Sequence, residues 1–406
     1  MLPLNPSTHS VRQALTRFVD IYVLPNYISM LADMLGVSKA EVAESRDQTC
    51  TERTAHFGLG KYLRVVLFPV ICLLLSSFSV AWGNTQKISG YFLGDYYYVP
   101  RSHHGELEER NGFQYRRVYF TYDKGLSSEF STRFRLEMNG KSFPTARQAT
   151  SKLEPFLKHG YLKWEPSGWR TNIYFGLSGT PTWRNVEKVW GYRSVAKTVL
   201  DLQKMGSSAD FGVALQGDID ASNLISYHLM IANGTGTRAE IDKNKKISFS
   251  LAAKPITGVT LEGYIDRENA ADLGKWHTLQ GFLGYQQERF RFGIQLANQT
   301  RQQADVDTLN ILASSVFGAV QLLEKKVWAF ARFDRLFDPN PNAETIPYIP
   351  FDNTARSNMI LVGLDWAPTE AVHIIPNLIF VFYDKPDNID KPDETIMPRL
   401  TVFFTF

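Results

Sequence analysis

The chain has 406 residues, a formal net charge of +3 and a mean hydropathy of −0.21. This hydropathy excludes a membrane protein made of many apolar helices, and the small net charge gives no indication of nucleic acid as a partner. An apolar content of 44% is compatible with two or three soluble domains, or with one large β-barrel in which only alternate strand residues are apolar.

The segment at residues 61–83 has the features of an export signal. It has a basic start at Lys61, an apolar run over Val65–Trp82 and a small residue, Gly83, at the cleavage position. This order predicts a signal peptide and a mature chain that begins at Asn84. The alternative is a membrane-anchoring helix, for which the run is just long enough.

Residues 1–60 precede this segment, although a signal peptide should begin a chain. Within them Leu31–Glu44 has helical spacing, but a DNA-reading domain needs more helices and a basic face. We favour the interpretation that residues 1–60 are an N-terminal extension from a misplaced start codon. Cys50 and Cys72 both precede the expected cleavage point, so the mature chain would contain no disulfide.

From Asn84 onward apolar and polar residues alternate, as in strands whose two faces meet different surroundings. The clearest case is Arg289–Asn298, in which every second residue from Phe290 to Leu296 is apolar. Sixteen such segments are predicted, at residues 88–99, 113–122, 129–138, 156–165, 171–178, 209–216, 223–232, 245–254, 259–268, 275–286, 289–298, 309–323, 326–337, 355–366, 370–383 and 394–406. The expected fold of residues 84–406 is therefore all-β, a transmembrane antiparallel β-barrel of about sixteen strands.

The connections between these segments alternate between short and long, as in bacterial outer-membrane barrels. The long connections include Asn139–Pro155, Gly179–Ser208, Asn269–Gly274, Gln299–Thr308 and Asp338–Thr354. Two segments fit less well, because Leu309–Leu323 is apolar on both faces and Pro376 interrupts the fifteenth. A soluble β-sandwich, β-helix or propeller is the alternative, but no repeat of roughly 20–50 residues is visible.

The last segment, Arg399–Phe406, is expected to close the barrel. Leu400, Val402, Phe404 and Phe406 share one face, and an unpaired strand with such a face would promote aggregation. With its terminal Phe406, this segment resembles the last strand of the outer-membrane porins of Gram-negative bacteria. The resemblance implies a location in the lipid bilayer of the outer membrane, recognition of the last strand by the barrel assembly machinery, and a homotrimer.

Selectivity in such a barrel is expected to arise in the third long loop, because sixteen strands leave a lumen too wide for side chains to fill. That loop, Gly179–Ser208, is the longest connection, and a helix is predicted over Arg193–Gln203. The stretch Trp190–Val195, which leads to Asp210–Gly212, is similar to the corresponding region of phosphate-selective (O/P-type) porins, and in general porins the third loop folds inward. The expected constriction residues are Trp183, Arg184, Lys188, Arg193 and Lys197. The alternative is an outward loop with a solvated charged face.

The inward faces of the predicted strands carry ten basic and seven acidic residues. The residues expected to line the pore are Arg117, Arg133, Arg135, Glu137, Arg289, Arg291, Arg332 and Asp334. Rings of Arg and Lys favour anions, so this balance indicates a mild anion preference, although many of these charges are also expected to form cross-strand ion pairs. The aromatic residues on some strands are expected either to form a slide for sugars or simply to belong to the girdle or wall: Tyr91, Tyr97, Tyr119, Tyr161 and Trp276.

No catalytic constellation is evident, so neither an enzyme nor a cofactor is predicted. Gly176–Gly179 lacks the spacing of a nucleophile elbow, and the neighbouring His103 and His104 lack a third metal ligand. The predicted function is a porin for the passive diffusion of small hydrophilic solutes and anions. The alternative is a non-transporting barrel that serves as an adhesin or surface scaffold. The loops of this chain are too short to form independent domains, which favours transport.

Overall fold

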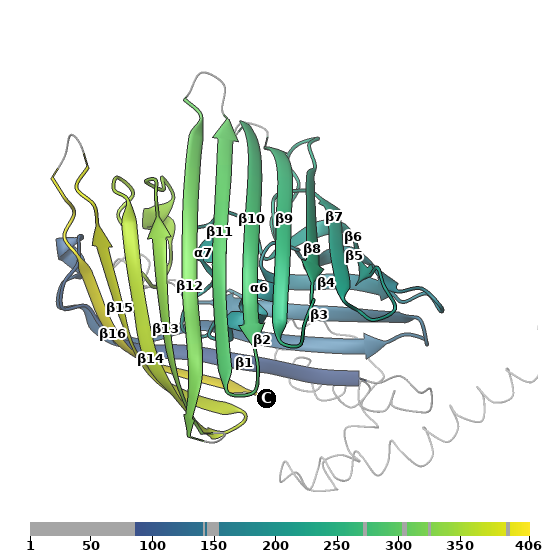
Figure 1. Cartoon of the computed structure of the whole chain (residues 1–406), viewed down its shortest axis with the longest axis horizontal. Coiled ribbons are helices and arrows are strands. Elements are labelled where there is room, and N and C mark those ends of the chain that lie inside the picture. The colour runs from purple at the N-terminus through teal and green to yellow at the C-terminus, as the bar shows by residue number, and fades with distance from the viewer. Residues whose placement is uncertain are drawn as a thin grey trace, which may run out of the picture. The chain divides into compact units, whose positions relative to one another are not determined.

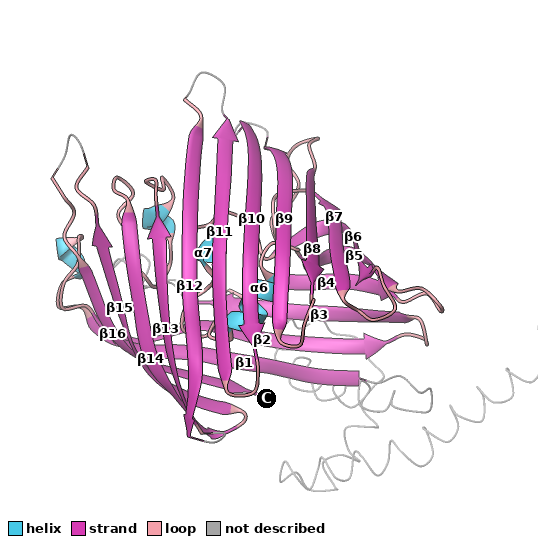
Figure 2. Cartoon of the chain, viewed as in Figure 1, coloured by secondary structure: helices cyan, strands magenta, loops and turns pink. Residues whose placement is uncertain are grey.

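A computed structural model describes residues 86–140, 143, 154–270, 274–302, 307–323, 326–386 and 390–406. These residues form one closed barrel of sixteen antiparallel strands (Figures 1 and 2). The predicted extension at 1–60 and the predicted signal peptide at 61–83 lie outside the described residues. Among the described residues, no helix has the length and hydropathy needed to cross a membrane.

The predicted all-β fold is confirmed, since each of the sixteen predicted segments overlaps one strand. The strands are β1 Gln86–Tyr98, β2 Asn111–Gly125, β3 Phe130–Asn139, β4 Phe156–Trp164, β5 Thr171–Gly179, β6 Ala209–Asp218, β7 Ile225–Ala232, β8 Lys246–Ala253, β9 Val259–Ala270, β10 Gly274–Gln286, β11 Phe290–Gln302, β12 Leu309–Leu323, β13 Val327–Leu336, β14 Ser357–Thr369, β15 Val372–Tyr383 and β16 Thr395–Thr405. Pro376 lies within β15, opposite Leu400 of β16, and its ring faces outward.

The first and last strands close the barrel, as predicted. Tyr91 lies opposite Thr405, and Tyr97 lies opposite Arg399. At the end of the chain the amide of Gly90 donates to the carbonyl of Phe406 at 2.9 Å, and the amide of Phe406 donates back at 3.1 Å. The terminal residue therefore takes part in the closure, and neither end strand remains as an unpaired edge.

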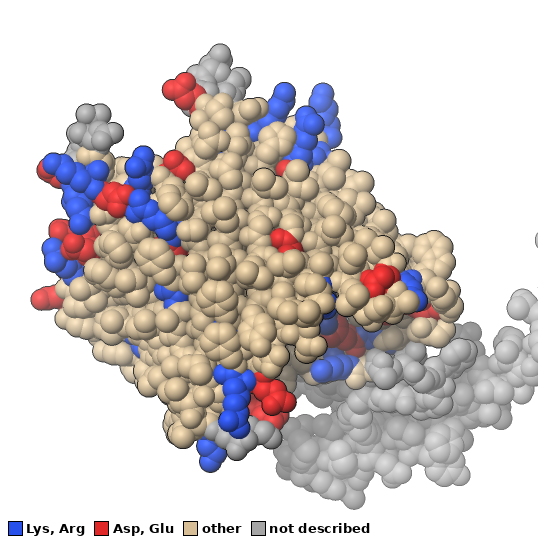
Figure 3. Space-filling view, in the orientation of Figure 1, with Lys and Arg blue, Asp and Glu red and all other residues tan. Residues whose placement is uncertain are grey.

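The outer face of the barrel is apolar. In β14 the outward residues Ile360, Val362 and Leu364 are 37–46% exposed, whereas Met359 and Leu361 between them are at most 1% exposed. In the view of Figure 3, Lys, Arg, Asp and Glu gather mainly at the ends of the strands and leave a broad area with few charges between them. An apolar surface of this extent suits contact with lipid.

Two predicted long loops are shorter than expected. Strand β9 continues to Ala270 and β10 begins at Gly274, so Asn269, Ala270 and Gly274 of the predicted loop Asn269–Gly274 belong to strands. Strand β11 continues to Gln302, which removes part of Gln299–Thr308. The backbone ladder does not require apolar side chains, so the alternation of hydropathy ends before the strand does.

The main apolar cluster lies inside the barrel. It joins inward residues of β10–β16 to residues of two connections, 180–208 and 337–356. The first connection contains α6 (Arg184–Trp190) and α7 (Val199–Leu202), the second contains η3 (Ala343–Thr345), and η2 (Gly105–Leu107) lies between β1 and β2. The helix predicted over Arg193–Gln203 is therefore limited to α7, and α6 was not predicted.

Candidate functional site

The connection 180–208, from β5 to β6, folds into the lumen and packs against the inner wall of β10–β13; we call it the constriction loop. The ring of Trp190, at the end of α6, lies 5.2 Å from that of Phe317 in β12, and Tyr192 stacks on Phe330 of β13 at 4.2 Å. Ile311 of β12 is completely buried in the same cluster. Strand β12 is apolar on both faces because one face is exposed on the outside and the other packs against this loop.

A second connection, 337–356 from β13 to β14, also contributes to the cluster, which the strand pattern did not predict. The amide of Lys197 donates to the hydroxyl of Tyr348 at 3.3 Å, and Asn340 Nδ2 donates to the carbonyl of Gln203 at 2.9 Å, so the two connections are bonded to each other. Its buried apolar residues are each at most 5% exposed: Ala343, Ile346, Tyr348, Ile349, Phe351 and Ala355. An apolar run within an otherwise polar connection was the signal available in the sequence.

Buried arginines of the wall donate hydrogen bonds to carbonyl groups of the constriction loop. Arg116 Nη1 and Arg399 Nη2 each donate to the carbonyl oxygen of Val195 at 2.9 Å, and Arg116 also donates to the carbonyl of Ser194. Asp95 Oδ2 lies 2.6 Å from Arg116 Nε and balances its charge. A buried carbonyl group without a donor costs about 1–3 kcal/mol, so these contacts stabilise the inward position of the loop.

Arg332 and Asp334, which were expected to line the pore, lie beneath the constriction loop instead. Arg332 Nε lies 2.8 Å from Asp334 Oδ1, and Arg332 Nη1 donates to the carbonyl of Lys197 at 2.5 Å. Gln299 of β11 donates in the same way to the carbonyl of Met205 at 2.7 Å. These inward residues hold the loop, because the loop covers the part of the wall from which they project.

Charged residues of the constriction loop also pair with one another. Asp201 accepts from Lys197 Nζ at 2.8 Å and from Arg193 Nη1 at 2.6 Å, and Arg193 pairs with Glu187 as well. Burial alone would raise the pKa of Asp201, but Lys197 and Arg193 together lower it, so the carboxylate remains ionised. Two of the five expected constriction residues are therefore largely neutralised within the loop.

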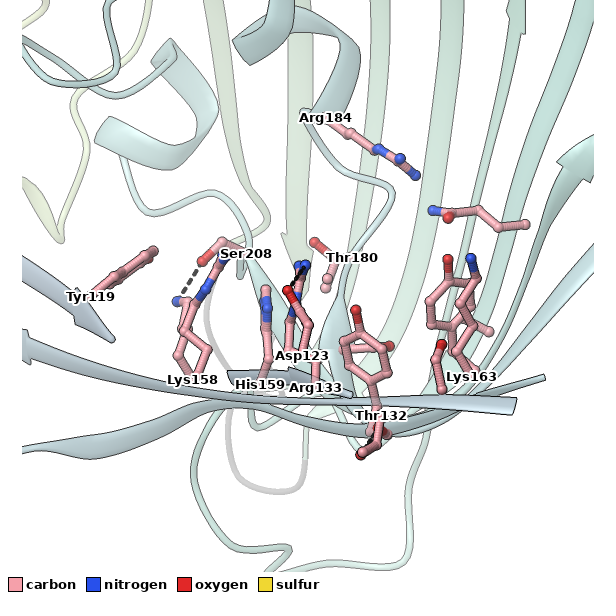
Figure 4. A pocket seen from close by; sticks show the side chains of 18 of the residues that line it. Tyr119, Asp123, Thr132, Arg133, Lys158, His159, Lys163, Thr180, Arg184 and Ser208 are labelled. Carbon is pink, nitrogen blue, oxygen red and sulfur yellow. Dashed lines mark hydrogen bonds and ion pairs between the residues drawn. The ribbon is translucent and has the colours of Figure 1, made fainter. Parts of the chain in front are cut away.

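A large open space lies between the constriction loop and the wall formed by β1–β7. It is a cavity of about 820 Å³, which we call the basic cavity. Figure 4 shows Lys158, His159 and Arg133 projecting into it from the wall strands, with Arg184 on the side of the loop. Lys124, at the end of β2 next to a short turn, also lines it, so the cavity extends to the short-turn end of the barrel.

Cations outnumber acids by eight to two around the basic cavity. The cations are Lys87, Lys124, Arg133, Arg135, Lys158, Lys163, Arg184 and Arg193, and the acids are Asp123 and Glu187. Both acids are paired: Asp123 accepts from Arg133 Nε and Nη2 at 2.6 and 3.0 Å, and Glu187 pairs with Arg193. Lys158, Lys163 and Arg193 also pair with acids next to the cavity, Glu137, Glu165 and Asp201. Among the described residues, Lys87, Lys124, Arg135 and Arg184 remain without an ion pair, so the net charge is positive, and a cavity with low-dielectric walls concentrates its field.

Two cations reach the lumen through β-bulges, which strict alternation cannot predict. The register between β1 and β2 shifts at Leu93 and Gly94, which leaves Arg116 without an opposite residue. A similar shift between β3 and β4 leaves Lys158 unopposed, and its Nζ donates to Ser208 Oγ at 2.7 Å. Under strict alternation both side chains would face lipid, where a cation costs about 2–4 kcal/mol at mid-depth. That conflict was the signal for a bulge.

The predicted pore residues of β2 and β3 fall into two groups. Arg133 and Arg135 line the basic cavity. Arg117 and Glu137 form a buried ion pair, with 2.8 Å between Nε and Oε1, and Lys158 Nζ lies 3.3 Å from the other oxygen of Glu137. This second group strengthens the wall next to the cavity.

The remaining predicted residues lie in different surroundings. Arg289 is exposed in the turn between β10 and β11, so it does not project from the lumen wall. Arg291 lies over the ring of Trp328 at 5.1 Å. Trp183 is buried at the edge of the basic cavity, and Lys188 is exposed on α6.

The histidine pair of the first long connection lies against the ends of β15 and β16. His103 Nδ1 lies 3.1 Å from Thr395 Oγ1 and 3.3 Å from the hydroxyl of Tyr383, and its ring is 4.2 Å from that of His104. Burial, and then the neighbouring His104, lower the pKa of His103 to about 4. In the part of the chain that the structure describes, no group of three or more His, Cys, Asp or Glu is placed to hold a metal ion.

No protein-family model matches the chain, and no curated protein sequence matches it. Solved structures do match its fold. An anion-selective porin from Comamonas acidovorans superposes with a TM-score of 0.59 at 9% identity, covering 80% of this chain and 100% of the other. OmpF of Salmonella typhi, solved in complex with daunomycin, superposes with a TM-score of 0.56 at 10% identity, covering 80% of this chain and 98% of the other. OprB of Pseudomonas putida superposes with a TM-score of 0.55 at 10% identity, covering 84% of this chain and 97% of the other.

These matches cover almost the full length of the other chains, and the identities are low enough that the likeness concerns the fold alone. The described residues of this chain therefore have the fold of an outer-membrane porin: a closed antiparallel barrel of sixteen strands.

Proposed function

We propose that this chain is an outer-membrane porin through which small hydrophilic solutes diffuse, with anions preferred over cations. The observation that carries the proposal is the basic cavity, which eight cations and two acids line and where four cations, Lys87, Lys124, Arg135 and Arg184, have no ion-pair partner among the described residues. The anion-selective porin among the structural neighbours is consistent with this preference, and the apolar outer face agrees with a location in the outer membrane.

The proposed mechanism combines a steric filter with an electrostatic one. The constriction loop and the connection 337–356 fill the side of the lumen next to β10–β16, so solutes are restricted to the side next to β1–β7. There the unpaired cations lower the energy of an anion and raise that of a cation, an effect that low-dielectric walls strengthen. The short-turn end would face the periplasm, as in bacterial barrels generally.

Three further features belong to the same proposal. An N-terminal signal at 61–83 would direct export, and the assembly machinery would recognise the C-terminal strand that ends in Phe406. A homotrimer and the narrower relationship to phosphate-selective porins are carried over from the resemblance described above.

The reversal potential of single channels in a planar bilayer tests the proposal, with KCl at two concentrations on the two sides. We expect steady channels whose reversal potential is shifted from zero towards the equilibrium potential of chloride. A potential on the potassium side would contradict the anion preference. A folded barrel that never conducts would contradict transport and favour the surface scaffold.

A further inference from the structure

Four tyrosine rings project into the basic cavity and form two pairs. Tyr91 of β1 lies against Tyr119 of β2, with 4.5 Å between ring centroids, and Tyr161 of β4 lies against Tyr174 of β5 at 5.3 Å. All four residues line the cavity, and three of them are only partly buried. Their place on the inner face distinguishes them from the aromatic girdle of a barrel, whose rings face the lipid interface.

Arg135 lies between these two pairs on the intervening strand, β3. Its guanidinium carbon is 5.0 Å from the ring centroid of Tyr119, and its opposite residue in β4 is His159, two positions from Tyr161. Arg135 Nε donates to Thr121 Oγ1 at 2.8 Å, which leaves its two terminal nitrogens for another partner. Among the described residues no carboxylate lies within ion-pair distance of Arg135.

The ring of Tyr161 has open space beside it. Its opposite residue in β5 is Gly176, which has no side chain to cover the ring. Gly176 has a φ of 118°, and a Cβ there would lie 2.4 Å from the carbonyl oxygen of Gly160, so the backbone itself requires glycine. The ring of His159 lies 6.1 Å from that of Tyr161, and its Nδ1 is buried without a partner among the described residues.

A small inorganic anion would use the guanidinium but not the rings. An anion with a flat aromatic body would use both, because a planar guanidinium matches a carboxylate in bidentate geometry and aromatic rings associate by offset or edge contacts. We propose that the basic cavity contains a binding site for aromatic carboxylates, with Arg135 on the carboxylate and the pairs Tyr91–Tyr119 and Tyr161–Tyr174 beside the ring. This inference rests on the proposed anion-preferring channel and adds a substrate class to it.

Block of the chloride current by added carboxylates tests this site. The probes are benzoate, cyclohexanecarboxylate, which has a similar size and charge but no π face, and acetate. We expect benzoate to halve the current at a concentration about three- to tenfold lower than cyclohexanecarboxylate, the range that one or two aromatic contacts supply. Acetate should be weaker than both.

Two substitutions assign the effect to the cavity. Tyr161→Leu should remove most of the advantage of benzoate over cyclohexanecarboxylate, whereas Tyr161→Phe, which keeps the ring, should retain it. Arg135→Gln should weaken block by both ring acids, since both depend on the same guanidinium. Reversal potentials in KCl alone, recorded on the same channels, report the anion preference independently of the probes.

The outcomes separate the two proposals. A chloride-preferring channel that benzoate and cyclohexanecarboxylate block equally would overturn the aromatic site and leave the anion channel intact. If the preference for benzoate is unchanged in Tyr161→Leu, the aromatic site lies elsewhere in the chain, and the assignment to the basic cavity is overturned. A channel without anion preference would overturn the proposed function itself.

Discussion

The two sides of the barrel have the same kind of apolar outer surface, but the inner surfaces that they turn to the lumen differ in polarity. On the side of β11–β15, inward residues such as Ile311, Phe317, Leu361 and Ile379 are buried against the two inserted connections. On the side of β1–β5, the inward residues are mainly charged or carry a hydroxyl, and they border open space. The inner face of a barrel strand therefore indicates what it meets: apolar inward residues mark a wall covered by a loop, and charged ones mark a wall in contact with water.

The charges follow the same division. Arg332 on the filled side is bonded to Asp334 and to a loop carbonyl, and Arg399 donates to the carbonyl of Val195. Arg135 and Arg184 on the open side have no ion-pair partner among the described residues. Arg332 and Arg399 therefore hold the loop, which covers them, whereas Arg135, which the loop does not cover, is left free to meet a solute.

The largest effect is expected from loosening the constriction loop, which fills one side of the lumen. Trp190→Ala should remove about 3–5 kcal/mol of packing, because the indole is 1% exposed between Phe317 and Phe330. The constriction loop should loosen while the barrel still closes, and single-channel conductance should rise about twofold or more as the lumen opens. Trp169→Ala is the matched control, since that indole is 63% exposed. An unchanged conductance in Trp190→Ala would show that the loop does not limit the passage.

The next effect concerns the open side. The double substitution Arg135→Glu and Arg184→Glu should reverse the ion preference of the channel, because it places unpaired acids where unpaired cations stood. We expect the chloride-to-potassium permeability ratio to fall by about tenfold, measured as a reversal potential, a change that two charges beside a narrow passage can supply. Lys188→Glu, which changes an exposed residue outside the basic cavity, should shift the ratio far less. Equal shifts in the two variants would indicate a general surface-charge effect.

The smallest effect is a pH dependence of the long connections. His103 is packed against His104 and Tyr383, with Asp352 nearby, and its pKa is lowered from 6.5 to about 4, chiefly by burial. The unfolded chain therefore binds this proton at a higher pH than the folded chain does. The contribution of His103 to the free energy of unfolding falls as the pH drops from about 6.5 to about 4, and it is constant below that. His103→Gln should lose less thermal stability than the unsubstituted chain between pH 7 and pH 4.5. Identical losses would show that this histidine does not titrate in its folded environment.

Much of the fold could be predicted because lipid and lumen place opposite demands on successive residues of every strand. The closing contact of Phe406 and the sixteen strands follow from that alternation. The strand ends were less predictable: β9 and β11 continue as hydrogen-bonded ladders beyond the apolar residues that mark them.

The site was only partly predictable, because alternation assigns a residue to the inner face without indicating what covers it. Arg135 and Arg332 have the same pattern in the sequence, yet the first lines a cavity and the second is covered by the loop. Arg116 was missed because it is itself the unopposed residue of a bulge, which turns it to the inner face. The apolar segment Ile346–Phe351 could have been recognised as a buried insert, since an exposed loop has no reason to carry it.

The division of the lumen can be tested most directly by the accessibility of single cysteines to a negatively charged thiosulfonate reagent, read out as loss of channel current. Tyr161→Cys would represent the open side and Leu361→Cys the filled side, in a background where Cys50 and Cys72 are replaced by serine. We expect rapid reaction and loss of current for Tyr161→Cys, and neither for Leu361→Cys. Comparable reaction at both positions would contradict a passage confined to the basic side of the barrel.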